Sequence, residues 1–181
     1  MTGSNPSEFN ATGNGNRPVE KVTWTEAVAF CTQLTTQEQN AGRLPAGWAY
    51  VLPTESQWEY ACRAGTTTAY SWGATIASSN ANYNATGINQ TRDVGQYAAN
   101  PWGFFDMHGN VWEWTADWYQ AAYPTGNPVV DPTGPSSGSY RVLRGCSWNR
   151  VGTLLRSAER NSHAPSTRND HLGFRVGFQK Q

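Results

Sequence analysis

Residues 106–114 read Asp106-Met107-His108-Gly109-Asn110-Val111-Trp112-Glu113-Trp114. Val111 to Thr115 alternates in character along the chain, and this alternation predicts a β-strand with one buried face. The Gly109-Asn110 pair directly before it is typical of a turn. This stretch therefore predicts a strand that begins immediately after a tight turn.

Two helices are predicted upstream by capping boxes, in which a Thr cap is followed three residues later by Glu or Gln. The first box is Thr23 with Glu26, and the second is Thr54 with Gln57. The apolar faces behind the caps follow a period of 3.6 and consist of Trp24, Ala27, Val28, Cys31 and Leu34, then Trp58, Ala61 and Cys62. We expect the first helix to end near Thr35 and the second at Gly65.

The rest of the chain favours loops and short strands. The expected loops are 1–20, 36–50, 66–110, 120–139 and 149–171, and the further expected strands are 141–144 and 173–178. Two helices, a few short strands and much irregular chain predict an α+β fold. With 181 residues, we expect one domain over 1–181.

Composition argues against several classes of protein. Charged residues are 14% of the chain and the formal net charge is zero, which argues against a disordered chain and a generally basic nucleic-acid binder. The sequence has no run of 18 apolar residues, so we expect no membrane span. The polar residues 1–20 show no signal peptide. The compartment stays open.

The charges are divided unevenly along the chain. Residues 1–140 carry 5 Lys or Arg against 11 Asp or Glu, a net charge of −6, whereas residues 141–181 carry 8 against 2, a net charge of +6. The simplest interpretation is that the basic tail folds back and pairs with the acidic part. A tail that binds phosphate or nucleic acid is the alternative, although its arginines are spread evenly rather than clustered.

The three cysteines form no recognisable framework, because they show neither a CxxC nor a Cys/His spacing. Cys31 and Cys62 lie on the apolar faces of the predicted helices, so we expect buried thiols. Cys146 lies in a Gly-Cys-Ser-Trp turn, where we expect more exposure.

Four ordered motifs resemble one family. They are LPTESQWEYACR at 52–63, DMHGNVWEW at 106–114, RGCSW at 144–148 and LGFRV at 172–176. Together they resemble the formylglycine-generating-enzyme (sulfatase-modifying factor) domain. This resemblance implies a variant of the C-type lectin fold with short twisted antiparallel strands. It also implies an N-terminally shortened chain, because residues 3–7 match a point already inside the domain.

The resemblance also carries implications for cysteine chemistry. Oxidase members of the family hold copper through two cysteines a few residues after the RGGS turn, and Cu(I) prefers such soft ligands. The corresponding stretch here, 149–155, has no cysteine. We therefore expect no copper and no formylglycine formation. The partners of Cys31 and Cys62 in secreted relatives correspond to Val176 and Ser157, so both thiols should be free, which favours a reducing compartment such as the cytoplasm.

Calcium is the cofactor that the resemblance implies. One structural site would use the side chains of Asp106 and Glu113 with the carbonyls of Gly109 and Val111, a set of oxygen ligands suited to a hard cation. A second site would use Asn82 and the Tyr83 carbonyl, although 85–92 contains no acidic residue to complete it. Alternatively, Asp106 caps a turn and Glu113 pairs with an arginine of the tail.

The polar stretch 149–171 resembles the ligand-binding face of the variable proteins of diversity-generating retroelements. A rigid aromatic core can carry a changeable loop surface at little cost to stability. The candidate ligand-binding surface is 148–171, and its contacting residues are expected to be Trp148, Asn149, Arg150, Val151, Thr153, Glu159, Asn161, Ser162, His163, Asn169, Asp170 and His171. The ligand would be a protein or a glycan. An ordinary solvated loop is the alternative.

Three classes of function therefore remain open. The leading hypothesis is a non-catalytic ligand-binding domain on a calcium-stabilised scaffold. The second is an enzyme of the same superfamily with an unrecognised site, although Ser147 and the histidines show no catalytic spacing. The third is a scaffold or accessory domain docked on a partner. The sequence identifies neither the ligand nor the oligomeric state.

Overall fold

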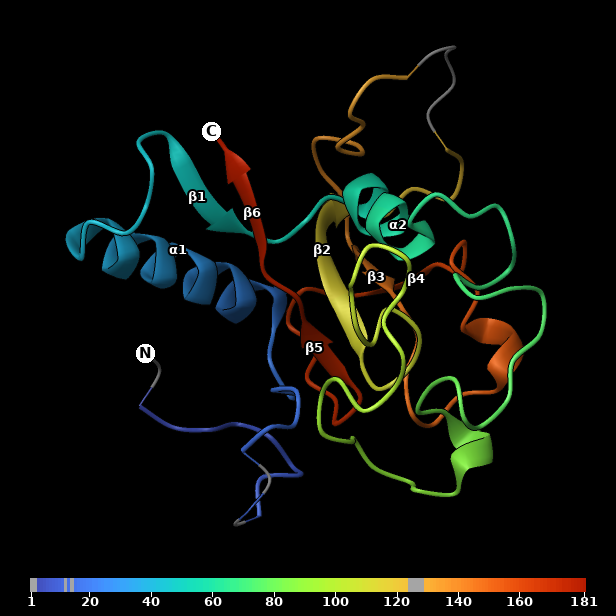
Figure 1. The fold of residues 1–181 in the computed structure, drawn as a ribbon. Helices are drawn as coiled ribbons and strands as arrows, with labels where there is room; N and C mark the ends of the chain where they lie inside the picture. The colour runs from blue at the N-terminus through green and yellow to red at the C-terminus, as the bar shows by residue number, and fades with distance from the viewer. Residues whose placement is uncertain (1–2, 12, 14, 124–128) are drawn as a thin grey trace.

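The structure is a computed structural model that describes residues 3–11, 13, 15–123 and 129–181. Its elements in chain order are α1 (Trp24–Asn40), β1 (Trp48–Val51), α2 (Glu55–Arg63), η1 (Asn84–Thr86), β2 (Trp112–Trp118), β3 (Arg141–Arg144), η2 (Gly152–Leu154), β4 (Asn161–His163), β5 (Leu172–Phe174) and β6 (Gly177–Lys180) (Figure 1). The expected α+β class is confirmed. Parts of the expected loops, 1–2, 12, 14 and 124–128, lie outside the described residues.

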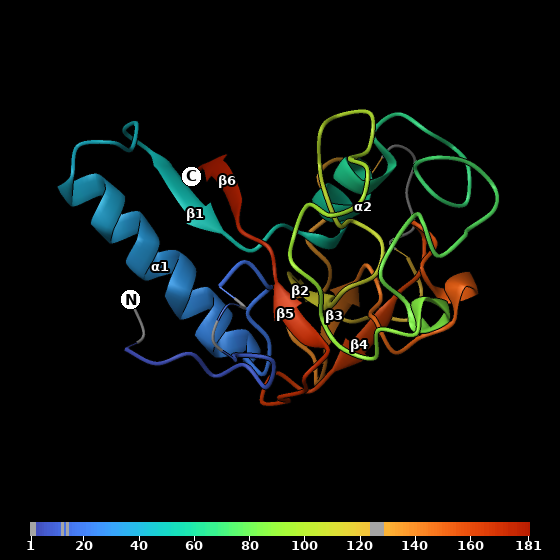
Figure 2. The same ribbon diagram turned by 60° about the horizontal axis from the view of Figure 1, so that its bottom comes forward.

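The strands form two sheets. A four-stranded sheet has the order β4-β3-β2-β5, and β1 pairs with β6 in a separate two-stranded sheet. Figures 1 and 2 show α1 beside the β1–β6 pair, whereas α2 lies over the larger sheet. Not every pair is antiparallel, because β2 and β5 run parallel. A parallel pair needs a long connection, and the chain from β3 through η2 and β4 provides it.

Both helices begin at the predicted capping boxes. Thr23 Oγ1 accepts a hydrogen bond from Glu26 N at 3.2 Å, and Thr54 Oγ1 accepts one from Gln57 N at 3.2 Å. α1 continues beyond the expected end at Thr35, because the Thr35 hydroxyl accepts from Tyr50 N at 2.8 Å and ties this turn to β1. α2 ends as predicted within one residue, through a left-handed residue directly before Gly65.

Three details of the sheets differ from the sequence prediction. The sequence predicts loops at 36–50 and 149–171, yet most of β1 lies in the first range and all of β4 lies in the second. The single expected strand 173–178 is divided into β5 and β6. It divides because β5 pairs with β2 and β6 pairs with β1, so the chain passes from one sheet to the other between them.

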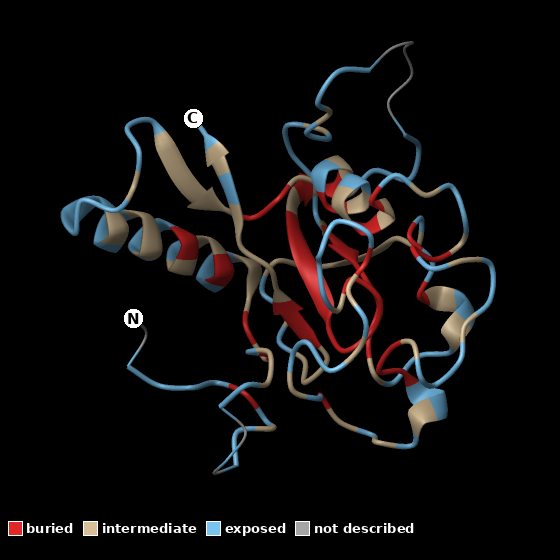
Figure 3. Cartoon of the chain, in the orientation of Figure 1, coloured by how far each residue is buried: buried red, intermediate tan, exposed pale blue. Residues whose placement is uncertain are grey.

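The core lies between α1, α2 and the larger sheet (Figure 3). Cys31 and Cys62 are buried and free, and the Cys62 thiol donates to the Met107 carbonyl at 3.7 Å. Cys146 is also fully buried, so its expected exposure was wrong. Its left-handed backbone, with φ of 66°, belongs to a turn that directs the thiol into the core.

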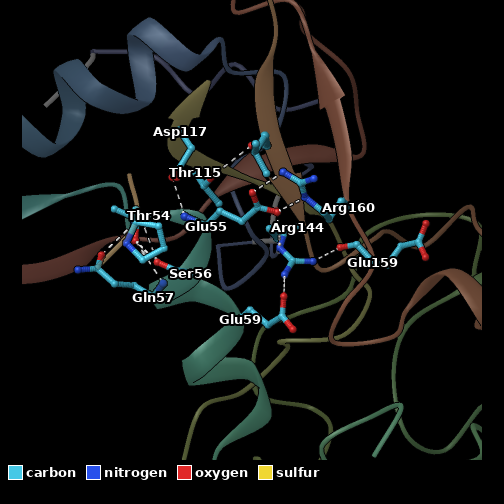
Figure 4. Close-up of polar contacts among 12 residues, drawn as sticks. Thr54, Glu55, Ser56, Gln57, Glu59, Thr115, Asp117, Arg144, Glu159 and Arg160 are labelled. Atoms are coloured by element: carbon cyan, nitrogen blue, oxygen red, sulfur yellow. Dashed lines mark hydrogen bonds and ion pairs between the residues drawn. The ribbon is translucent and has the colours of Figure 1, made fainter. Parts of the chain in front are cut away.

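The basic tail does fold back onto the acidic part of the chain. Its ion pairs are Arg144 with Glu55 and Glu59, Arg160 with Glu55, Arg168 with Glu26, and Arg175 with Glu113. Figure 4 shows Arg144 between α2 and the carbonyl of Glu159, to which it donates a hydrogen bond. These ion pairs confirm the prediction that the basic tail pairs with the acidic part of the chain.

No helix in the described part of the chain combines the length and apolar character that a membrane crossing requires.

Replacing Arg144 with Ala should strongly destabilise the fold. The Arg144 side chain is fully buried, and its removal leaves two carboxylates on α2 without this partner. We expect a loss of about 3–5 kcal/mol in the free energy of unfolding, measured by denaturant titration. Arg43→Ala is the control, because Arg43 forms an exposed pair with Glu38, and its loss of stability should be far smaller. Equal losses in the two variants would contradict this account.

Candidate functional site

Two turns interlock at the base of the candidate surface. Gly109 N donates to the Gly145 carbonyl at 2.7 Å, and Trp148 N donates to the Asn110 carbonyl at 3.0 Å. Gly109 has a φ of +84°, and a Cβ there would lie 2.3 Å from the Asn82 carbonyl oxygen. Only glycine therefore fits this position. Together, the two hydrogen bonds and this close approach fix the point at which the chain after Trp148 leaves the core.

A polar cluster surrounds Trp148. Its indole Nε1 donates to the Asp170 carbonyl at 3.4 Å. Asn149 Nδ2 lies 3.4 Å from His171 Nδ1, which in turn lies 2.9 Å from Asp170 Oδ1. Four of the expected contacting residues, from two segments 22 positions apart, therefore come together.

The exposed part of the candidate surface is smaller than expected. Asn149, Arg150, Val151 and Thr153 are exposed, and we call these four positions the exposed patch. The other eight expected residues are half-buried. The patch follows directly after the interlocked turns, so its backbone is anchored while its side chains face solvent.

Several expected residues serve the framework as well. Asn161, Ser162 and His163 form β4 and pair with 141–143 of β3. Glu159 forms an ion pair with Arg156, and the carbonyl of Asn169 accepts from Lys21 N at 3.0 Å. Burial lowers the pKa of His163, and the nearby His171 and Arg150 lower it further. The expected set is therefore divided between the exposed patch, strand β4 and half-buried positions that bond to neighbouring segments.

Phe9 is a residue that the sequence reasoning missed. Its ring packs edge-on against Trp148, with centroids 5.8 Å apart and an interplanar angle of 80°. Phe9 N donates to the buried carboxylate of Glu20 at 2.9 Å, which holds this part of the N-terminal segment in place. No period in the sequence of 1–20 indicates such a contact, and the described residues 3–11, 13 and 15–19 form neither helix nor strand.

The expected ligands of the first calcium site lie along one groove of about 460 Å³. Asp106 Oδ2 accepts from Gly95 N at 2.7 Å, and burial raises the pKa of this carboxyl. Glu113 accepts from Arg175 at 2.8 and 2.9 Å and from Trp58 Nε1 at 2.6 Å. The alternative contacts, a capped turn at Asp106 and an arginine on Glu113, are thus both present.

The groove retains oxygen atoms that a cation could bind. A carboxylate offers about four lone-pair sites, of which three face donors at Glu113. Two carboxylates and the guanidinium of Arg175 leave the groove with one net negative charge. Among the described residues no group of three or more His, Cys, Asp or Glu side chains gathers for a metal. A cation here would therefore rely on the carbonyls of Gly109 and Val111.

The expected atoms of the second calcium site already have partners. The Tyr83 carbonyl accepts from Thr86 N at 3.0 Å and from Thr86 Oγ1 at 2.7 Å, and Asn82 Oδ1 accepts from the same hydroxyl at 3.2 Å. Asn82 Nδ2 donates to Asn110 Oδ1 at 3.2 Å. These bonds connect η1 to the Gly109-Asn110 turn, and the second site stays a prediction.

Comparison with known proteins agrees with the motifs and the geometry. Residues 1–179 match the model of the sulfatase-modifying factor enzyme 1-like domain. The chain belongs to this family. It is 35% identical over 182 residues to the formylglycine-generating enzyme of Streptomyces coelicolor, covering 91% of this chain and 53% of that protein. This chain therefore spans about half the length of that curated relative.

Two solved structures show the same fold. Treponema denticola variable protein 1 superimposes with a TM-score of 0.87 and 33% identity, covering 99% of this chain and 78% of that one. PvdO from Pseudomonas aeruginosa gives a TM-score of 0.77 and 27% identity over 92% of this chain and 63% of that one. These two differently named proteins thus share the fold of this chain.

Within this sulfatase-modifying factor domain, the buried cysteines are poor nucleophiles. Burial raises the pKa of Cys62 and of Cys146 to about 12 each, and the thiolate is the reactive form. Ser147 donates to Asn149 Oδ1 at 2.9 Å, whereas the His108 ring bonds elsewhere. The geometry therefore gives no support to a Ser–His nucleophile here.

His108 is held neutral inside the domain. Its Nδ1 lies 2.6 Å from the Leu155 carbonyl, so this nitrogen donates, and Nε2 accepts from Ser71 N at 3.2 Å. Burial lowers the pKa of His108 to about 4, because the charged ring would lose its hydration. Protonation of His108 therefore opposes the folded state.

Stability should fall as the pH drops from 6.5 towards 4. In this window the unfolded chain protonates His108 and the folded chain does not, which costs roughly 2–3 kcal/mol at most. Denaturant titrations at pH 7 and pH 4.5 on the native protein and His108→Gln would measure this, because the variant retains every other titrating group. We expect the acid-induced loss to be larger in the native protein, and equal losses would overturn the assignment.

Proposed function

We propose that this domain binds a protein or glycan ligand through the 148–171 surface and carries out no oxidase chemistry. The observation that supports this most directly is the likeness to Treponema denticola variable protein 1 over nearly the whole chain. The exposed patch at 149–151 and 153 adds physical support, since it lies on an anchored backbone. Binding residues commonly occur on loops that a rigid scaffold positions.

The chemistry of the surface suits a ligand rich in hydrogen-bond acceptors. Arg150 is exposed, His171 and His163 lie beside it, and Asn149 offers both a donor and an acceptor. Trp148 supplies a large flat ring that its neighbours already hold, so binding would cost little conformational entropy. Flat aromatic anchors beside polar groups are typical of binding hot spots.

An enzyme is the second candidate function, because the chain is 35% identical to a formylglycine-generating enzyme. Two thiolates are the ligands that Cu(I) prefers, and residues 147–181 contain no cysteine. The remaining nearby thiol, Cys146, is fully buried. The residues therefore favour binding over oxidation of a cysteine substrate.

Diversification of the exposed patch is the testable consequence of the proposed function. We expect a reverse transcriptase and a near-copy of the 3′ end of the gene nearby, differing at adenines. Sequencing this locus in several isolates should place coding differences at 149–151 and 153 and few at the buried positions of the same region. An invariant 3′ end without a second copy would contradict the proposal.

A direct assay separates the enzymatic alternative. The protein loaded with copper under reducing conditions and mixed with a cysteine-containing sulfatase-type peptide should form no aldehyde, detectable by mass spectrometry. Formation of formylglycine would replace the binding proposal with the oxidase. Absence of the aldehyde together with a diversified locus would support binding.

We further propose that calcium binds the groove at Asp106 and Glu113 as a structural ion. An ion that binds only the folded state stabilises it by about 2.7 kcal/mol at a hundred times its Kd. Calcium should therefore raise the melting temperature and EDTA should lower it. Asp106→Asn should remove most of this response, whereas Asp93→Asn, at a partly exposed ion pair, should retain it. No response to calcium or EDTA in the native protein would end the proposal.

A further inference from the structure

A tight turn places Trp72 at the surface, away from the 148–171 surface. Tyr70 and Gly73 exchange backbone hydrogen bonds of 3.0 and 3.1 Å, so Ser71 and Trp72 form the tip of the turn. The Trp72 residue is 37% exposed. Family membership and the proposed function leave this exposed ring unexplained.

The indole is held firmly despite its exposure. It stacks on Tyr70 with an interplanar angle of 3° and centroids 5.3 Å apart, and it meets the His108 ring at 4.6 Å in a T-shaped contact. Its Nε1 donates to the Thr75 carbonyl at 2.9 Å. Because the ring is already ordered, a ligand that contacts it would not have to immobilise it.

An open groove of about 300 Å³ lies against this ring. It is lined by Ser71, Trp72, Ser79, Asn80, Asn100 and Pro101, together with the alanines at 98–99. None of these residues carries a charge. Ser79 is exposed and its hydroxyl lies at the rim. Asn80 is half-buried and its Oδ1 accepts from Ala77 N at 2.8 Å, which leaves its Nδ2 as the donor at the rim.

The lining selects a chemical class of ligand. A phosphate, carboxylate or ammonium group would lose hydration here without meeting an opposite charge. A purely apolar ligand would leave the hydroxyl and amide groups of the rim unpaired. A sugar ring suits both features, since its hydroxyls bond to polar side chains and its C–H face lies on the partly negative face of an indole.

We propose that this groove binds a neutral saccharide, with one sugar ring stacked on Trp72 and its hydroxyls bonded to Ser79 and Asn80. The volume lies at the lower end of the range for small-molecule sites, which suits one ring rather than a long chain. The groove shares no lining residue with the 148–171 surface, so the two proposals stand or fall separately.

NMR titration of the tryptophan indole N–H signals tests this proposal. The probes are methyl β-D-glucopyranoside, methyl α-D-mannopyranoside and N-acetylglucosamine, added separately at millimolar concentrations. The Trp72 signal, assigned by its absence in Trp72→Phe, should shift saturably with at least one of them. Trp72→Ala removes this reporter, so its affinity is measured by saturation-transfer difference NMR on the sugar signals. It should bind about tenfold or more weakly than the native protein, whereas Trp102→Ala should bind as the native protein does. Trp102 is also exposed but lies outside the groove.

A second pair of variants protects the test from misfolding. Ser79→Arg should place a long charged side chain in the groove and abolish the shift at an unchanged melting temperature. Ser78→Arg, at the neighbouring exposed position outside the lining, should leave binding intact. The proposal fails if no probe shifts the Trp72 signal, or if Ser79→Arg binds as well as Ser78→Arg.

Discussion

The hydrogen bond from Gly109 N to the Gly145 carbonyl joins the two turns on which the rest of the domain depends. It is 2.7 Å long, and beside it the Asn82 carbonyl leaves no room for a Cβ at Gly109. β2 and β3 are the two central strands of the larger sheet. One turn leads into β2, and the other leads out of β3 towards the candidate surface. The bond therefore sets the position of the surface relative to the core without using any exposed side chain.

Long-range ion pairs also hold the framework together without using the exposed patch. Arg144 and Arg160 reach Glu55 on α2, and Arg175 reaches Glu113 on β2. These arginines are spread through the basic tail, between and beside the residues of the 148–171 surface. Charge pairing can therefore fix the backbone of the basic tail while the side chains of the exposed patch change.

The parts of the fold that depend on neighbours in sequence could be predicted, and those that depend on distant partners could not. The capping boxes at Thr23 and Thr54 and the strand 141–144 are local patterns. β1 has four residues and pairs Trp48 with Lys180 at the other end of the chain, so neither its length nor its neighbours reveal it. The site follows the same rule. The polar composition of 149–171 indicated the stretch that contains the exposed patch, but not which four positions are exposed. The contact of Phe9 with Trp148 joins two segments with no shared pattern.

The central claim is that a fixed frame carries a surface whose side chains can change. Two libraries displayed on cells and challenged with protease test it most directly. One randomises the exposed patch, and the other randomises the buried positions Cys146, Ser147, Leu155 and Ser157 of the same region. The account predicts that most members of the first library resist the protease and most of the second do not. Equal losses in both libraries would show that the patch is part of the frame, and would contradict the account.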